Sequence, residues 1–349
     1  MPGIDYEHEA RALLPPHASE YFAAAAGTGS SLAEGIADWG ALRFRPRVLR
    51  DLRVIDSATT VLGTPVETPI LIAPMAQQLA AHTDGERAMG RAAASVGSAI
   101  GVSTNCAIPF AEIEAAGAPW WYQVYVTKER SLTELLVERA VAAGARALML
   151  TVDMMALLPA DVNPLNWPDV PGKARMTNLT PAEIAAAGPN GIRMDFNVTF
   201  DDIGWLAELS GLPVLVKGVL RGDDAAECMD AGAAGIVVST HGGRRLGPSI
   251  SAARALPEVV KAVAGRGEVY VDSGIRNAEH VAAALALGAT GVFVGRPAMW
   301  ALAARGEDGV RHVLEDLVTE LRLVMLQLGA PSIAHLTPDL LVATRADHH

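Results

Sequence analysis

Cysteine is scarce in this sequence, which has two, Cys106 and Cys228, among 349 residues. Two cysteines cannot build a disulfide framework or a cysteine-rich metal centre, so we expect neither, and their scarcity is typical of a reducing cytoplasm. The first residues have neither the basic start nor the apolar stretch of a secretory signal. No apolar run approaches the ~18 to 20 residues that span a bilayer. We therefore expect a soluble, cytoplasmic protein.

Basic residues are also in the minority. There are 28 Lys and Arg against 39 Asp and Glu, which gives a formal net charge of -11. An acidic surface repels nucleic acids and anionic membranes on average, so neither is expected as the main partner. Half of the residues are apolar, so the chain can build a large core around a small-molecule site.

Short apolar runs alternate with alanine-rich amphipathic stretches from Pro69 onward. Several of these stretches end in Ala-Gly-Ala or Leu-Gly-Ala, and glycine at that place is typical of a helix end in a βα repeat. Eight repeats predict an α/β protein with a closed (β/α)8 TIM barrel. A doubly wound open sheet is the alternative, but no dinucleotide fingerprint opens the first helix. The predicted strands are 70–73, 99–103, 120–124, 147–151, 214–216, 235–238, 269–271 and 291–294.

The chain length fits a single barrel domain over residues 1–349. Residues 1–68 form an N-terminal helical extension and cap, with two short helices separated at Pro15-Pro16, and residues 69–308 form the barrel. A long insertion at 154–200, after the fourth strand, predicts a lid or specificity loop with a helix near 181–187. Residues 309–349 form a C-terminal amphipathic helix and tail.

Polar residues follow the predicted strands, and barrel enzymes use that end of the strands for chemistry. Each residue alone could simply begin a loop, but their coincidence at successive strands indicates a site. After the first strand come Pro74, Met75 and Ala76. The later strands are followed by Ser103; Gln123 and Tyr125; Thr151 and Asp153; Lys217; Ser239, His241 and Arg244; Asp272, Gly274 and Arg276; and Gly295 and Arg296.

The stretch from Ser239 to Arg245 is the centre of this prediction. Its two glycines let backbone approach a ligand closely, His241 can accept a proton near neutral pH, and Arg244 can bind a carboxylate. A glycine-rich turn with incidental polar residues is the alternative. If Asp153 lies beside the imidazole, it would orient that ring and raise its pKa.

An anion site is predicted beside this stretch. Small residues and two arginines after strands seven and eight form a phosphate cradle in this fold, although tight turns with surface arginines are the alternative. Lys217 ends a very apolar run, where a cation is costly unless an anion faces it.

From about Tyr21 to Leu341 the chain resembles the FMN-dependent 2-hydroxy acid oxidase and dehydrogenase family, which includes glycolate, lactate and mandelate oxidases. Six motifs carry this resemblance. The motifs are Ile72-Ala73-Pro74, Gln123-Val124-Tyr125, Leu150-Thr151-Val152-Asp153, Leu215-Val216-Lys217-Gly218, Ser239-Thr240-His241-Gly242-Gly243-Arg244 and Gly295-Arg296-Pro297.

The resemblance implies a role for each matching residue. His241 would be the base, with Asp153 as its partner. Arg244 would bind the substrate carboxylate. Tyr125 and Tyr21 would hydrogen-bond substrate oxygens, although core packing is the alternative for Tyr21. The FMN ring would contact Pro74, Met75, Ala76, Ser103, Gln123, Thr151, Lys217 and Ser239. Its ribityl chain and phosphate would contact Asp272, Gly274, Arg276, Gly295 and Arg296.

Two positions depart from the family pattern. Ala160 stands where the family commonly carries a second substrate arginine, and Asn105 replaces a frequent bulky aromatic. The missing charge would weaken carboxylate binding by about 1.5 to 3 kcal/mol. Arg245, Arg175 or Arg193 could supply it.

Three functions follow as hypotheses. The first is FMN-dependent oxidation of a 2-hydroxy acid, larger than glycolate or aryl-substituted, with O2 as electron acceptor. The second keeps the flavin but oxidises an amine, an amino acid derivative or a carboxylate-poor alcohol. The third is a catalytically silent barrel that binds FMN as a sensor or scaffold. The resemblance also suggests a homotetramer.

Overall fold

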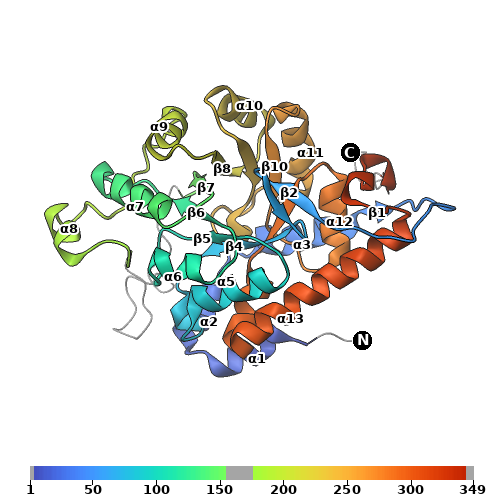
Figure 1. The fold of residues 1–349 in the computed structure, drawn as a ribbon, viewed down its shortest axis with the longest axis horizontal. Coiled ribbons are helices and arrows are strands. Elements are labelled where there is room, and N and C mark those ends of the chain that lie inside the picture. The colour runs from blue at the N-terminus through green and yellow to red at the C-terminus, as the bar shows by residue number, and fades with distance from the viewer. Residues whose placement is uncertain (1–3, 155–175, 343–349) are drawn as a thin grey trace.

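The barrel occupies the centre of the computed structural model, which describes residues 4–154 and 176–342 (Figure 1). Its parallel strands pair in chain order, and the last pairs back with the first, so the cylinder is closed. The predicted TIM barrel is therefore confirmed, and each predicted strand is present. The strands are β4 (Ile70–Met75), β5 (Ile100–Val102), β6 (Trp120–Val124), β7 (Ala147–Thr151), β8 (Val214–Val219), β9 (Gly235–Val238), β10 (Glu268–Val271) and β11 (Gly291–Val294).

Helices surround this cylinder and cover the outer faces of its strands (Figure 1). Alanine and leucine on their inner faces join one large buried cluster with the outward side chains of the strands. They are α4 (Gln78–Ala81), α5 (Gly85–Ser95), α6 (Phe110–Ala115), α7 (Arg130–Ala142), α9 (Asp201–Ser210), α10 (Gly222–Asp230), α11 (Ala252–Val263), α12 (Ala278–Ala286) and α13 (Arg296–Leu328). The short helix α8 (Pro181–Ala186) lies outside this ring and has no buried residue (Figure 1).

The barrel interior is a separate apolar core. Trp121, Tyr270 and Phe293 are fully buried there and meet edge to face or tilted, with ring centroids 5.2 to 5.8 Å apart. The antiparallel hairpin of β2 (Thr59–Val61) and β3 (Thr64–Val66) adds Val61 and Val66 to the same core. Its turn donates from the Leu62 backbone to Glu268, the first residue of β10. This end of the cylinder is closed, so a ligand reaches the barrel from the opposite end.

Three N-terminal helices precede the barrel: α1 (Tyr6–Leu13), α2 (Pro16–Ala23) and α3 (Ser30–Ala41). As predicted, the first two are separated at the proline pair. The segment between α2 and α3 is tied to the loop after β9, since the Ala26 amide donates to the Gly243 carbonyl over 2.8 Å. Ser31 Oγ also donates to the Leu246 carbonyl over 2.9 Å.

The C-terminal helix α13 is longer than predicted. It begins at Arg296, directly after β11, rather than near residue 309, and it bends at Arg305 and Gly306. Gly306 has a φ of +60°, and a left-handed residue breaks the helical period that the sequence shows. After the helix come η3 (Ile333–His335), η4 (Pro338–Leu340) and β12 (Leu341–Val342), which pairs with β1 (Arg43–Phe44).

The predicted helix near 181–187 is present as α8, with a capping box between Thr180 and Glu183. The insertion is described only from residue 176 onward, so Ala160 and Arg175 lie outside the described residues. Within residues 4–154 and 176–342, no helix has the length and apolar character needed to cross a membrane. No group of metal-ligating side chains is found in that part of the chain either.

Candidate active site

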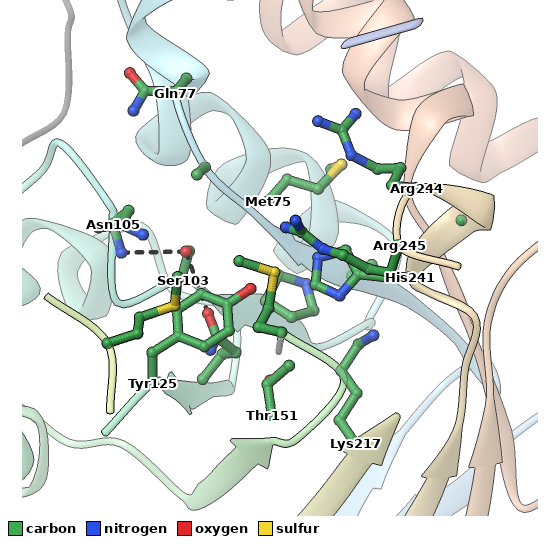
Figure 2. Close-up of a pocket in the computed structure, with 18 of the residues that line it drawn as sticks. Met75, Gln77, Ser103, Asn105, Tyr125, Thr151, Lys217, His241, Arg244 and Arg245 are labelled. Atoms are coloured by element: carbon green, nitrogen blue, oxygen red, sulfur yellow. Dashed lines mark hydrogen bonds between the residues drawn. The ribbon is translucent and has the colours of Figure 1, made fainter. Parts of the chain in front are cut away.

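A cavity of about 1080 Å³ opens at the carboxyl ends of the barrel strands (Figure 2). Every barrel strand contributes a lining residue either from its own end or from the loop that follows it. All of the predicted site residues line this cavity except Asp153 and Ser239. Those two lie directly behind it, where each hydrogen-bonds a residue that does line it.

His241 and Asp153 form the central pair. Nδ1 of His241 lies 2.9 Å from Oδ1 of Asp153. Burial alone would raise the pKa of Asp153, but the charge and hydrogen bond of His241, with Lys217 and Arg245, lower that pKa to about 2. The carboxylate is therefore ionised at neutral pH and accepts the Nδ1 proton. Nε2 of the imidazole is left as the basic nitrogen.

The imidazole itself is uncharged at neutral pH. Burial lowers the pKa of His241, the Asp153 carboxylate opposes this in part, and Lys217 and Arg245 add to the lowering. A neutral imidazole held by a carboxylate can accept a proton and can then be stabilised as the cation.

An unusual turn presents this histidine to the cavity. His241, Gly242 and Gly243 have φ values of +55°, +68° and +72°, and only glycine adopts this region at little cost. A Cβ at Gly243 would lie 2.6 Å from the Leu32 backbone nitrogen of α3. The strained backbone of His241 is thus held in a turn whose other two residues are glycines, which adopt a positive φ at little cost.

Two tyrosines and an arginine stand beside the histidine. Arg244 Nη1 donates to the Tyr21 carbonyl over 2.7 Å, and its Cζ lies 4.7 Å from the centroid of the Tyr21 ring. Burial lowers the pKa of Arg244. Burial, followed by the nearby Asp153 carboxylate, raises the pKa of Tyr125, so its hydroxyl stays protonated and can donate to a ligand oxygen.

Lys217 is a buried cation on β8, 4% exposed. Its Nζ lies 2.8 Å from Oδ2 of Asp272 and donates to Oγ of Ser239 over 2.7 Å. Since Lys217 also lines the cavity, its charge is directed at any ligand that lies there.

Two buried polar atoms at the base of the cavity lack partners among the described residues: Nε2 of Gln123 and Oγ1 of Thr151. Gln123 is fixed in orientation, because its Oε1 accepts from Oγ of Ser103 over 3.2 Å. Unsatisfied buried polar groups are costly, so a polar ligand is expected to contact them.

Arginines gather at the end of the cavity formed by β10 and β11. Burial, and then the charges of Arg244 and Arg276, lower the pKa of Arg296 to about 9. Burial also lowers the pKa of Arg276. Arg296 donates to the carbonyls of Phe22, Ala24 and Gly242. Clustered cations of this kind are stabilised by an anion such as a phosphate.

The wall opposite these arginines is formed at the end of β4. Pro74, Met75 and Ala76 line the cavity there, and the pairing of β4 with β5 is irregular between Ile72 and Met75. Gly274 and Gly295 complete the lining next to the arginines.

An outer apolar wall was not predicted from the sequence. These residues come from the described part of the insertion, and all except Ile184, which lies on α8, are outside its helix. A lid or specificity loop was predicted there, but its apolar residues were not singled out. They are Met176, Leu179, Ile184, Ile192, Met194 and Phe196.

The residues present fit FMN. Nε2 of Gln123 could donate a hydrogen bond to the polar edge of an isoalloxazine, and Oγ1 of Thr151 could donate or accept one. Lys217 adds a cation to the same cavity. The arginine cluster with Arg276 and Arg296 offers a phosphate site. The closed barrel, its phosphate site and the histidine base are those expected of a flavin-dependent oxidoreductase.

Comparison with known proteins supports this class. The profile of the family described as FMN-dependent dehydrogenase matches residues 10–343. The chain is 41% identical to an L-lactate oxidase from Nostoc sp. over 345 residues, which is 95% of this chain and 94% of the relative. It is 39% identical to glycolate oxidase 1 from Oryza sativa subsp. indica, with 96% and 93% covered. A structure of mandelate oxidase with benzoyl-formic acid superposes with a TM-score of 0.88 at 35% identity, with 97% of each chain covered.

The chain belongs to the FMN-dependent dehydrogenase family. The resemblance stated from the six motifs is confirmed, and the protein is an enzyme of the 2-hydroxy acid oxidase type with FMN as its cofactor. The hypothesis of a catalytically silent barrel is thereby replaced.

Proposed function

We propose that the protein oxidises a 2-hydroxy acid with a large or aryl side chain to the 2-oxo acid and passes the electrons through FMN to O2. The observation that carries this proposal is the buried pair of His241 and Asp153, which faces a cavity rich in cations and roofed by apolar side chains. A 2-hydroxy acid offers a carboxylate to the cations and an apolar group to the roof. The mandelate oxidase structure was solved with an aryl ligand, which supports the same class.

The chain's own residues divide the work as follows. The oxidation removes two hydrogens from the substrate, one from carbon 2 and one from its hydroxyl. Nε2 of His241 accepts one of them as a proton, and Asp153 stabilises the imidazolium that forms. Tyr125 and Tyr21 hydrogen-bond substrate oxygens, and Arg244 attracts the carboxylate. Lys217 stabilises negative charge that develops on the cofactor side. Bound FMN supplies the two-electron redox chemistry.

The lining of the cavity, rather than its total volume of about 1080 Å³, favours the larger substrates, because FMN would occupy part of that volume. Asn105 lines it where a bulkier residue would fill space. The apolar wall of Met194, Phe196 and its neighbours would pack against an aryl ring and exclude water.

A second candidate is an amine or carboxylate-poor alcohol. The observation that favours it is the engagement of Arg244 Nη1 by the Tyr21 carbonyl, which removes one donor from carboxylate binding.

Anaerobic bleaching of the flavin separates these candidates. Mandelate, lactate and glycolate would be compared with mandelamide, benzylamine and benzyl alcohol, and H2O2 would be measured after air is admitted. We expect mandelate to bleach fastest. Bleaching by none of the hydroxy acids would contradict the first function, and bleaching by the amine alone would support the second.

The base is tested separately. His241→Ala should abolish bleaching by mandelate while the purified protein stays yellow, because His241 faces the substrate and not the phosphate cluster. Bleaching at an unchanged rate in this variant would refute the assignment of the base.

We further propose one domain over residues 1–349 that assembles as a cytoplasmic homotetramer. The family resemblance supports the tetramer, and the two buried, unpaired cysteines suit a reducing compartment. Sedimentation analysis of the holoenzyme tests the assembly, and fractionation of the source cells tests the compartment.

A further inference from the structure

Arg245 is a charged residue at the cavity that the family resemblance leaves without a role, as are Lys128 and Arg193. It follows Arg244 directly, after the left-handed turn of His241 to Gly243, and it lines the cavity. Its Nε is buried and has no hydrogen-bond partner within residues 4–154 and 176–342. A buried guanidinium donor left unpaired is unfavourable, so its position favours a ligand that brings an acceptor.

The two neighbouring arginines differ in what holds them. Arg244 donates to the Tyr21 carbonyl and lies over the Tyr21 ring, so part of its guanidinium is already engaged by the chain. Figure 2 shows the guanidinium of Arg245 beside His241, whereas that of Arg244 extends away from the imidazole. Arg245 is therefore the arginine with a donor available next to the base.

Electrostatic effects place Arg245 among the reacting groups. Its charge is near enough to Asp153, His241 and Tyr125 to shift the pKa of each. A substrate whose carbon 2 lies at His241 and whose hydroxyl lies at Tyr125 carries its carboxylate one bond away. That carboxylate falls within reach of the unpaired edge of Arg245.

We propose that Arg245 is a specificity-determining residue that binds the substrate carboxylate together with Arg244, so that two consecutive arginines form the anion clamp of this enzyme. The inference rests on the proposed function, since it names the group that selects an acid over a neutral analogue. It accounts for recognition of a carboxylate by a chain with alanine at position 160. Arg193, the other described candidate, lies in the outer wall beside Ile192 and Met194.

The clamp is tested with ligands that bind but cannot be oxidised. Benzoylformate and its neutral amide, benzoylformamide, would be titrated into the oxidised holoenzyme, and the change in flavin absorbance gives each Kd. The variants are Arg245→Met and Arg245→Gln. Arg221→Met serves as the control, because Arg221 is an exposed arginine paired with Asp223 on the outer surface.

Loss of the charged contact should raise the Kd of benzoylformate roughly 10- to 100-fold in both Arg245 variants, the range expected for one charge-assisted hydrogen-bonding group. The Kd of benzoylformamide should change less than about threefold. Arg245→Lys should recover part of the lost affinity, because it restores the charge but not the planar fork. The Arg221 variant should match the wild type for both ligands.

A pH profile gives a second readout that a purely structural role would not move. The charged groups around His241 are Asp153 after β7, Lys217 on β8 and Arg245 on the same turn. Removal of the Arg245 charge raises the pKa of His241, so the acid limb of kcat/KM for mandelate should move to higher pH in Arg245→Met. Arg245→Lys should leave that limb close to its wild-type position.

Each outcome decides the inference. If the Arg245 variants lose equal affinity for the acid and the amide, the proposed clamp is overturned. It is also overturned if they lose affinity for neither ligand while mandelate still bleaches the flavin of the wild type. Both outcomes leave the proposed function standing. If the wild type binds neither ligand and no hydroxy acid bleaches it, the proposed function fails and the clamp fails with it. FMN content and melting temperature are measured for every variant, and a misfolded Arg245→Met is replaced in this comparison by Arg245→Gln.

Discussion

The substitution Asp153→Asn isolates the charge behind the histidine. Asparagine keeps the shape of the side chain that lies 2.9 Å from His241 Nδ1, but it carries no charge. With charge centres about 4 Å apart and an effective dielectric constant of about 20, the lost attraction to the imidazolium is at most ~4 kcal/mol. The lower bound is the ~1.5 to 3 kcal/mol of a charge-assisted hydrogen bond. We therefore expect flavin reduction to slow roughly 10- to 1000-fold.

The pH dependence of the variant has a definite sign. In the wild type the Asp153 carboxylate raises the pKa of His241 against the lowering by burial. Its removal lowers that pKa further, so the acid limb of kcat/KM should move to lower pH while the plateau falls. The imidazole is then uncharged over a wider pH range, yet it is a weaker base.

Anaerobic stopped-flow reduction of the FMN-loaded enzyme measures this effect directly. FMN content should match the wild type, because Asp153 lies behind His241 and does not line the cavity. Asp223→Asn, an exposed carboxylate paired with Arg221, is the matched control. A yellow Asp153→Asn enzyme that is reduced within threefold of the wild-type rate, or an acid limb that moves to higher pH, would refute the reasoning.

Three further substitutions test the supports of the site. Lys217→Met leaves Asp272 buried without its cation and should lower the free energy of unfolding of the apoprotein by about 3 to 5 kcal/mol in urea titrations; an unchanged midpoint would contradict it. Gly242→Ala places a Cβ 2.6 Å from Nη1 of Arg296 at a φ of +68°, so the Kd for FMN, measured by fluorescence quenching, should rise; an unaltered Kd would exclude strain at this contact. Trp121→Ala removes a fully buried ring from the barrel interior and should lower the free energy of unfolding by about 3 to 5 kcal/mol. Denaturant titration measures this loss, and an unchanged free energy of unfolding would contradict it.

The barrel could be predicted from the sequence because its signals are local. Each strand is a short apolar run bounded by polar or glycine residues, and each glycine-terminated amphipathic stretch predicts a helix. The C-terminal helix predicted from residue 309 corresponds to the part of α13 that follows the bend at Arg305 and Gly306. The helical part before this bend begins at Arg296 and lies in the range assigned to the barrel, and no separate helix was predicted there.

The candidate site was accessible from the sequence only as a set of strand ends. The approach of Asp153 to His241, 88 residues apart, depends on the parallel pairing of β7 and β9 with β8, which brings the loops after β7 and β9 to one edge of the sheet. The orientation of Arg245 relative to Arg244 depends on a left-handed turn and on contacts with the Tyr21 segment. No periodicity in the sequence encodes either arrangement.

The ties between the N-terminal segment and the loop after β9 set a limit on how this enzyme can be shortened. Carbonyls of Tyr21, Phe22 and Ala24 hold Arg244 and Arg296, and Ala26 is bonded to Gly243. A minimal protein that kept the eight βα units and discarded the first forty residues would retain a complete cylinder. It would also release both guanidinium groups from their anchors, so a complete set of barrel strands does not by itself make a complete site.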